Sequence, residues 1–309
     1  MSQQILMTHP LLQSCVDGLE ERFTVHRLYE QQDQTEFLQA NGKNIRAIAG
    51  GSVDAQLMDA LPNLEIISNF GVGYDSIDTD AAKARNIRVT NTPDVLNDAM
   101  AEITIGLMIC LARQIPQAER YLRAGKWPKS AFGLQSELTG KTVGIAGLGR
   151  IGKEVATRCQ AMKMRVVYYG RNRQNNVPYT YYDNLKEMAR DVDWLVVLTP
   201  GGEGTKNLID RNILTALGPQ GMLVNVSRGS VVDEPVLIQM LQKKQIGGAA
   251  LDVFADEPNV PDALIGLDNA VLSPHQGSAT HQTRYAMGAL VVTNLEAHFA
   301  GAPLLTPVV

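Results

Sequence analysis

The sequence predicts an α/β protein with two Rossmann-like, doubly wound parallel-sheet domains. Three observations favour this fold class. Short apolar segments rich in Val and Ile alternate with segments of helical spacing along the chain, which is typical of parallel sheets covered by helices. A glycine pattern, G-x-G-x-x-G, follows one of the apolar segments near the middle of the chain. The length of 309 residues suggests about two domains.

The strongest local pattern is a βαβ unit in the middle of the chain. Thr142–Ala146 is short, apolar and β-branched, as a buried parallel strand is. Ile151–Met162 has helical spacing, and Arg165–Tyr169 is a second apolar strand. The alternative is a glycine-rich turn without a ligand, but a strand before the glycines and a helix after them favour a dinucleotide site.

The three glycines of this pattern have separate roles. Gly147 allows a tight turn, Gly149 lets the backbone approach a pyrophosphate, and Gly152 lets helix and strand pack closely. The helix N-terminus presents unpaired N–H groups and a partial positive charge. We therefore expect the phosphates of a dinucleotide at this loop.

The first part of the chain predicts a smaller parallel α/β domain. Its expected strands are Ile5–Met7, Phe23–Leu28, Ile45–Ala49, Leu64–Ser68 and Ile87–Val89. Its expected helices are Leu11–Arg22, Gln34–Ala40, Val53–Leu61 and Ile77–Arg85. The turn Asn69–Tyr74 contains two glycines, whose exposed N–H groups can bind a small carboxylate; a plain turn is the alternative.

Thr92-Pro93 marks the end of this first part. The helix expected over Asp98–Arg113 is too hydrophobic all round for an exposed helix, so we expect it to be buried between domains or against a partner chain. A more polar helix is expected over Ile115–Gly125, followed by an irregular segment, Trp127–Leu138.

After the central βαβ unit, strands and helices alternate again. The expected strands are Trp194–Leu198, Met222–Val226, Ile246–Val253 and Ala270–Leu272. The expected helices are Tyr182–Arg190, Arg211–Leu217, Glu234–Lys244 and a long closing helix, Thr280–Ala300.

Three polar residues follow three of these later strands. Arg228, Glu257 and His275 each come after a different strand, and ligands of open parallel sheets bind outside the carboxyl ends of the strands. We therefore expect all three beside the glycine loop. Singly, they could be a surface ion pair, a solvated loop charge and a capping residue; together they favour catalysis. His281 is the rival histidine, within the closing helix.

The chemistry that these residues could share is hydride transfer to a 2-oxo acid. Arg228 can bind the substrate carboxylate or polarise the carbonyl with its planar guanidinium. His275 can donate a proton to the carbonyl oxygen and act as the base in the reverse direction. Glu257 can hold the imidazole in place and favour its protonated form.

The expected cofactor is NADP(H), preferred over NAD(H). An NAD-specific site places Asp or Glu about 20 residues after the glycine loop, but no acidic residue occurs from 155 to 182. Instead Gly170-Arg171-Asn172-Arg173 follows the second strand, and both arginines can pair with a 2′-phosphate. The alternative is that they are solvated loop charges.

Composition excludes some partners. A net charge of −4 gives no reason to expect nucleic acid or an anionic membrane. Met1–Pro10 lacks the features of a signal peptide, and the apolar run Ile103–Ala112 is too short to span a membrane. The three cysteines have no metal or redox spacing, so we expect no metal site and a cytoplasmic location.

Four ordered motifs resemble one family, the D-isomer-specific 2-hydroxyacid dehydrogenases. They are Val143–Gly152, Leu223–Asp233, Ala249–Pro258 and Leu272–Thr280. Weaker similarity extends through Asn69–Ile77 and Val89–Arg113. The resemblance implies a substrate-binding domain, residues 1–97 with 279–309, and a dinucleotide-binding domain, residues 98–278. It places the active site in the cleft between them and implies a homodimer.

The resemblance also implies site residues. Val72 and Gly73 match backbone amides that bind the substrate carboxylate, and Asp252 matches a position beside the nicotinamide carboxamide. Arg228, Glu257 and His275 keep the roles given above, Arg228 and His275 as substrate-binding residues too. The complete set expected to bind the cofactor is Thr104, Gly147, Leu148, Gly149, Arg150, Ile151, Gly152, Gly170, Arg171, Asn172, Arg173, Thr199, Pro200, Val226, Ser227, Arg228, Asp252, His275 and Gly277.

Within the family, the sequence is most similar to the glyoxylate/hydroxypyruvate reductases. A hydroxyphenylpyruvate reductase remains an alternative, because Phe70 lies in the carboxylate loop and its effect on substrate size does not follow from the sequence. A phosphoglycerate dehydrogenase would need a site for the substrate phosphate. A dinucleotide-sensing corepressor of the same fold is the alternative outside enzymes, and the complete acid/base set argues against it.

Overall fold

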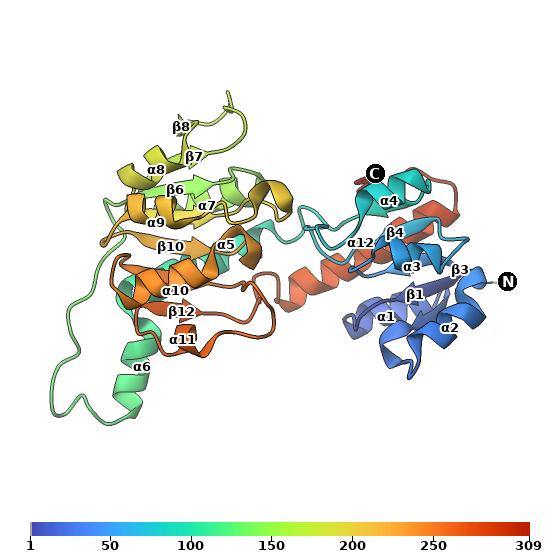
Figure 1. Ribbon diagram of the computed structural model, residues 1–309, viewed down its shortest axis with the longest axis horizontal. Helices are drawn as coiled ribbons and strands as arrows, with labels where there is room; N and C mark the ends of the chain where they lie inside the picture. Colours follow the sequence, from blue (N-terminus) through green and yellow to red (C-terminus); the bar gives the residue numbers. More distant parts are fainter. Residues whose placement is uncertain (1) are drawn as a thin grey trace. The chain divides into compact units, whose positions relative to one another are not determined.

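The protein is described by a computed structural model over residues 2–309, and it divides into two compact units. The terminal unit consists of the chain up to Leu96 together with Ala279–Val309, and the central unit is Asn97–Ser278. Each range differs by one residue at the first boundary from the domain range expected from sequence. Both units are parallel α/β sheets, which confirms the predicted fold class (Figure 1).

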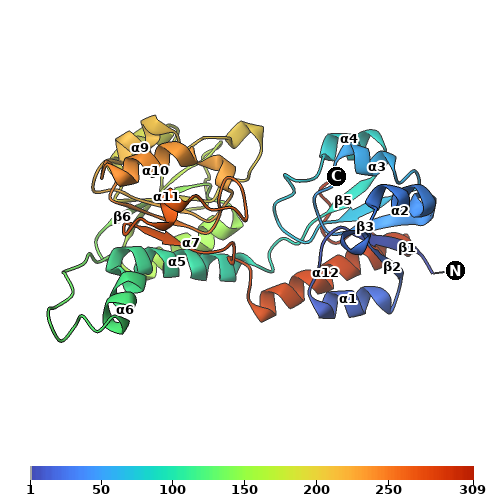
Figure 2. The ribbon, with the colours of Figure 1, turned by 60° about the horizontal axis from the view of Figure 1, so that its bottom comes forward.

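The terminal unit has a five-stranded sheet in the order β2-β1-β3-β4-β5. Its strands, all paired in parallel, are β1 (Gln4–Met7), β2 (Thr24–Arg27), β3 (Ile45–Ala49), β4 (Ile66–Ser68) and β5 (Arg88–Thr90). Its helices are α1 (Gln13–Glu20), α2 (Gln34–Asn41), α3 (Ala55–Asp59), α4 (Thr79–Ala84) and α12 (His281–Phe299). Helices α1 and α12 cover one face, and α3 and α4 cover the other (Figure 2).

The central unit has a seven-stranded parallel sheet in the order β12-β11-β10-β9-β6-β7-β8. Its strands are β6 (Thr142–Ala146), β7 (Arg165–Tyr169), β8 (Thr180–Tyr182), β9 (Trp194–Val197), β10 (Met222–Asn225), β11 (Gly248–Leu251) and β12 (Ala270–Leu272). Its helices are α5 (Asn97–Arg113), α6 (Ile115–Arg123), α7 (Arg150–Ala161), α8 (Leu185–Asp191), α9 (Arg211–Leu217), α10 (Glu234–Gln242) and α11 (Asp262–Ile265). Its central strands are buried on both faces, as their continuous apolar sequences require.

The apolar helix α5 belongs to the core of the central unit itself. It packs against α7 and across β10, β11 and β12, and its side chains Leu107, Met108 and Leu111 are buried in that core. Figure 2 shows α5 and α7 on one face of the sheet and α9 and α10 on the other. The sheet of its own unit therefore covers much of the apolar surface of α5. The sequence had instead predicted that another domain or a partner chain would cover it.

Two short elements were missed. The predicted helix Tyr182–Arg190 is wrong at its start, because Thr180–Tyr182 forms the edge strand β8 and the helix begins only after Asn184. The side chain of Asn184 caps that helix by accepting from the amide of Lys186 at 2.9 Å. Helix α11 is only one turn long, too short for helical periodicity to reveal.

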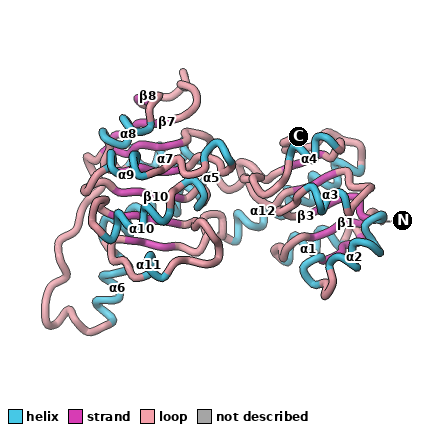
Figure 3. The backbone as a smooth tube through the Cα atoms, viewed as in Figure 1, coloured by secondary structure: helices cyan, strands magenta, loops and turns pink. Residues whose placement is uncertain are grey.

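A long loop between α6 and β6, drawn as loop in Figure 3, extends away from the sheet of the central unit. No single helix among residues 2–309 is long and apolar enough to cross a membrane; α5 and α6 pass such a test only as a pair bent by 59°.

Candidate active site

The dinucleotide loop lies where the strand order of the central sheet reverses. Strand β6 is flanked by β7 on one side and β9 on the other, so the loops after β6 and β9 diverge at this point. Ligands of open α/β sheets bind at such a switch point. The glycine loop follows β6 directly, and Thr199-Pro200 follows β9.

The surroundings of the three glycines show which of them packing requires. Gly147 has φ = +101°, and a Cβ atom there would lie 2.8 Å from the carbonyl carbon of Leu198. A Cβ at Gly152 would lie 2.5 Å from the carbonyl oxygen of Gly147. Around Gly149, in contrast, a Cβ would meet no protein atom within 4 Å. Two glycines are therefore required by packing, whereas Gly149 leaves open space beside the backbone.

This open space suits a pyrophosphate. Gly149 is the N-cap of the twelve-residue helix α7, and no side chain caps that terminus. The helix therefore presents uncapped N–H groups and the positive end of its dipole there. The hydroxyl of Thr199, across the switch point, is buried without a hydrogen-bond partner among the described residues. Both features fit a bound dinucleotide.

The loop after β7 is the expected position of the cofactor's ribose. Gly170 follows β7, and Arg171, Asn172 and Arg173 are exposed. Within residues 2–309, neither arginine forms an ion pair with a carboxylate. Sequence analysis missed Gln174, whose side chain donates to the carbonyl of Leu148 at 2.6 Å and ties this loop to the glycine loop.

Arg228 lies on a tight loop after β10. The side chain of Asn225 holds this loop, since its amide donates to the Arg228 carbonyl at 2.9 Å and its oxygen accepts from the Ser227 hydroxyl at 2.8 Å. The guanidinium of Arg228 donates from Nη1 to the Ser227 carbonyl at 2.8 Å. A Cβ at Gly229 would overlap the backbone of Phe254, so the loops after β10 and β11 touch.

Glu257 and His275 form a direct pair. Nδ1 of His275 lies 2.6 Å from Oε2 of Glu257, and because an ionised carboxylate can only accept, Nδ1 carries the proton. The other carboxylate oxygen accepts from the Phe254 amide at 3.0 Å, which fixes the carboxylate. His275 has φ = +48°, an uncommon conformation for a residue with a side chain. The pair leaves Nε2 available for a substrate.

Asp252 organises the loop that carries His275. Its carboxylate is 1% exposed and accepts from the Ser273 hydroxyl at 2.6 Å and from the amides of Gln276 and Gly277 at 2.9 and 2.8 Å. A Cβ at Gly277 would lie 2.5 Å from Met100 Sδ, so the loop also packs closely on α5. The family resemblance implies Asp252 beside the nicotinamide carboxamide, and the structure adds that Asp252 holds the His275 loop in place.

The structure thus brings Arg228, Glu257 and His275 to the carboxyl ends of the adjacent strands β10, β11 and β12, at the same edge as the glycine loop. His281 starts α12 in the terminal unit instead. The remaining residues expected at the cofactor differ in accessibility. Thr104 is fully buried and donates to the Met100 carbonyl, Leu148, Val226 and Ser227 are buried, Ile151 is partly buried, and Arg150 and Pro200 are exposed.

Val72 and Gly73 lie in the terminal unit, in the loop after β4. The carbonyls of this loop are already paired: Gly71 accepts from the Thr92 amide at 3.0 Å, Val72 from Asn91 at 2.9 Å, and Gly73 from Asn69 at 2.9 Å. The amides of Val72 and Gly73 donate to no group among residues 2–309, and both residues are partly exposed. The loop therefore offers two N–H donors to an anion.

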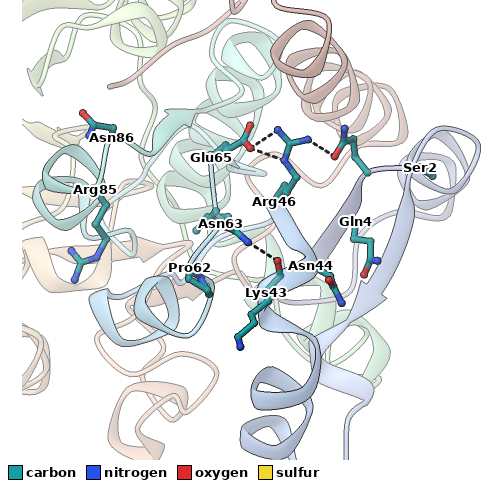
Figure 4. Close-up of a pocket in the computed structure, with 12 residues that line it drawn as sticks. Ser2, Gln4, Lys43, Asn44, Arg46, Pro62, Asn63, Glu65, Arg85 and Asn86 are labelled. Carbon is teal, nitrogen blue, oxygen red and sulfur yellow. Dashed lines mark hydrogen bonds and ion pairs between the residues drawn. The ribbon is translucent and has the colours of Figure 1, made fainter.

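A polar hollow of 610 Å³ in the terminal unit lies at the opposite edge of its sheet. It is lined by residues at the amino ends of β1, β3 and β4, where Arg46 pairs with Glu65 (Figure 4). Because parallel sheets bind ligands at their carboxyl ends, this hollow is not the candidate active site.

Comparison with known proteins agrees with this geometry. The family model described as "D-isomer specific 2-hydroxyacid dehydrogenase, NAD binding domain" matches residues 105–277. The chain belongs to the D-isomer-specific 2-hydroxyacid dehydrogenases. This confirms the family predicted from the motifs. The protein is accordingly an oxidoreductase that binds a nicotinamide dinucleotide.

Relatives of this dehydrogenase span nearly its whole length. A glyoxylate/hydroxypyruvate reductase A of Arabidopsis thaliana is 46% identical over 99% of this chain and 98% of its own. A hydroxyphenylpyruvate reductase of Plectranthus scutellarioides has the same identity and coverage. A solved structure, the NADPH-dependent glyoxylate/hydroxypyruvate reductase of Sinorhizobium meliloti with NADP and malonate, is 44% identical, with a TM-score of 0.96 over 100% of this chain and 97% of that one.

Proposed function

We propose that this dehydrogenase reduces a small 2-oxo acid, glyoxylate or hydroxypyruvate, to the D-2-hydroxy acid with NADPH. The observation that carries the proposal is the Glu257–His275 pair, which holds an imidazole with Nε2 available at the sheet edge of the dinucleotide loop. When bound, the reduced nicotinamide supplies a hydride to the substrate carbonyl carbon.

The chain's own residues supply the proton and the charges. His275 donates the Nε2 proton to the carbonyl oxygen, so the developing alkoxide is neutralised as it forms. Glu257 holds Nδ1 and stabilises the imidazolium before the transfer. Arg228 polarises the carbonyl and binds the carboxylate, and the amides of Val72 and Gly73 are further donors to that carboxylate.

The proposed preference for NADPH depends on the loop after β7. Arg171 and Arg173 are exposed and form no ion pair within residues 2–309, so both are available to a 2′-phosphate, and Asn172 adds a neutral donor. Gly170 stands where an NAD-specific enzyme places a carboxylate. The Sinorhizobium meliloti enzyme solved with NADP gives independent support.

A hydroxyphenylpyruvate reductase is the second candidate, because a relative of that name is as similar as the glyoxylate/hydroxypyruvate reductase. The test is a panel of 2-oxo acids assayed with NADPH and NADH and compared by kcat/KM. We expect glyoxylate and hydroxypyruvate with NADPH to give the highest values. A higher value for hydroxyphenylpyruvate would support the second candidate, and no turnover of any 2-oxo acid would refute both.

We further propose a homodimer. The central unit exposes large apolar side chains on α6 and the loop after it, namely Ile115, Leu122, Trp127 and Leu134. A hollow of 440 Å³ between α5, α6 and that loop is lined in part by Ile109, Phe132 and Leu134. A second copy related by a two-fold axis would cover this surface. Light scattering at micromolar concentration should give the mass of a dimer; a monomer mass would contradict the proposal.

A further inference from the structure

Arg284 of the terminal unit is a half-buried cation without a carboxylate partner. It lies in the first turns of α12, and its guanidinium carbon is 5.5 Å from the centre of the Phe70 ring. No carboxylate of residues 2–309 forms an ion pair with it. Burial lowers the pKa of Arg284, which means that the surroundings do not compensate its charge for the lost water.

Four other arginines of the same unit are paired with carboxylates, and a fifth, the exposed Arg88, donates to the Val309 carbonyl. Arg22, Arg27, Arg46 and Arg85 each form an ion pair with a carboxylate. The side chains of all four are partly exposed, so water also screens their charges. Burial lowers the pKa of Arg284, whereas hydrogen bonds to glutamates raise the pKa of Arg22 and of Arg27, so the surroundings of Arg284 compensate its charge least of these three.

The neighbours of Arg284 place it at the carboxyl edge of the terminal sheet. Phe70 follows β4 and begins the loop with the unpaired amides of Val72 and Gly73. His9 follows β1, and its pKa is lowered by burial and then by the charge of Arg284, so at neutral pH it adds no second positive charge. Strands β1 and β3 form the switch point of this sheet, where ligands bind.

We propose that Arg284 is a specificity-determining residue that binds an oxygen-bearing group on the third carbon of the 2-oxo acid. The inference rests on the proposed function. Within the terminal unit, the amides of Val72 and Gly73 are already assigned to the carboxylate of the 2-oxo acid, so Arg284 is available for a second oxygen-bearing group of the substrate. The guanidinium of Arg284 lies against the ring of Phe70, in the loop that carries the Val72 and Gly73 amides, so its N–H groups can bind the hydroxyl of hydroxypyruvate beside a carboxylate held by those amides.

The test compares two substrates that differ at the third carbon. Glyoxylate has no third carbon, whereas hydroxypyruvate carries a hydroxyl there. Arg284→Met keeps a long apolar side chain against Phe70 but removes the charge. We expect kcat/KM for hydroxypyruvate to fall roughly 10- to 100-fold, the range for a hydrogen bond to a charged group, and that for glyoxylate to fall less than about threefold. The kcat/KM of Arg284→Lys for hydroxypyruvate should lie between the values of the wild type and of Arg284→Met.

Equal losses on both substrates would overturn the proposal, since Arg284 would then bind their common carboxylate or support the fold. Unchanged values for both would overturn it too. Arg85→Met is the matched control, because it removes a paired cation of the same unit and should leave the substrate ratio unchanged. If wild-type enzyme reduces neither substrate, the proposed function fails; if it is active and Arg284→Met keeps the wild-type ratio, only this inference fails.

A binding measurement gives a second readout that does not depend on turnover. Malonate has a carboxylate at its third carbon, and oxalate has only two carbons. Calorimetry should show that Arg284→Met weakens malonate binding at least roughly tenfold while oxalate binding changes little. Equal weakening of both ligands, or of neither, would contradict the role of Arg284.

Discussion

The two units share an architecture but differ in what they present at the carboxyl edges of their sheets. In the central unit, β6 runs through a glycine loop into the uncapped start of the twelve-residue helix α7, and Arg228, Glu257 and His275 follow other strands. In the terminal unit, β1 is followed by Thr8-His9-Pro10, and the corresponding edge offers loop amides and Arg284, which forms no ion pair with a carboxylate of residues 2–309. Similar sheets thus carry different functional groups at their carboxyl edges, because the loops and not the sheet determine which groups are presented.

Replacing His275 tests the catalytic edge of the central unit. His275→Asn should lower kcat by roughly two to four orders of magnitude, the contribution of a general acid, because an asparagine amide cannot transfer a proton to the carbonyl oxygen. NADPH binding, measured by fluorescence titration, should be nearly unchanged. His281→Asn is the matched control and should keep most of the activity. Wild-type turnover by the His275 variant would make His281 the next candidate.

Arg228→Lys tests whether geometry or charge matters at this edge. Lysine keeps the charge but loses the planar fork that can bind a carboxylate and a carbonyl together. We expect kcat/KM for the 2-oxo acid to fall at least roughly tenfold. A structure with bound substrate would decide the matter, and a carboxylate far from both Arg228 and the Val72–Gly73 amides would contradict the assignment.

Two glycine variants separate packing from ligand binding in the dinucleotide loop. Gly149→Ala puts a Cβ into open space, so the melting temperature should hold while NADPH binding weakens at least roughly tenfold. Gly152→Ala puts a Cβ 2.5 Å from the Gly147 carbonyl oxygen and should destabilise the fold by about 1–3 kcal/mol. Calorimetry measures the stability of both variants, and titration measures their affinity for NADPH. Normal NADPH affinity of Gly149→Ala would show that no phosphate occupies this space.

The cofactor preference is tested at the loop after β7. Wild-type enzyme should prefer NADPH over NADH at least roughly tenfold in kcat/KM, equivalent to about 1.4 kcal/mol. Replacing Arg171 and Arg173 together with Ala should raise KM for NADPH far more than for NADH. If the two cofactors lose equally, these arginines do not bind the phosphate.

The smallest expected effect concerns the rate at which a buried cysteine of each unit is labelled. Burial raises the pKa of Cys159, in the central unit, to about 12 and that of Cys15, in the terminal unit, to about 11. At pH 8 only about one in 10⁴ and one in 10³ of these thiols is ionised, and thiolates are the reactive form. Each unit increase in pH below these values should raise the labelling rate about tenfold. Rapid labelling of either native thiol at pH 8 would show that its unit opens locally.

The sequence by itself determined the fold class, the dinucleotide loop and the placement of Arg228, Glu257 and His275 at one edge of the sheet. Apolar runs of three to five residues bounded by turn residues are strand signals, so Thr142–Ala146 and Ala270–Leu272 were predicted with the bounds observed. Arg228, Glu257 and His275 could be grouped because parallel strands end at one edge. Strand β8 was missed because Thr180–Tyr182 lacks the aliphatic run of the equally short edge strand β12, so its pairing with β7 is what reveals it.

Only the tertiary structure decided which groups are partnered. Asp252 anchors the His275 loop through contacts up to 25 residues away, and Gln174 connects two loops 26 residues apart. The partner of α5 is its own sheet, which its hydrophobicity alone could not reveal. Arg284 gave no signal in the sequence, because an arginine on a helix is ordinarily solvated. Its significance comes from a missing counter-charge, and the absence of a partner is a property of the folded environment and not of any residue type.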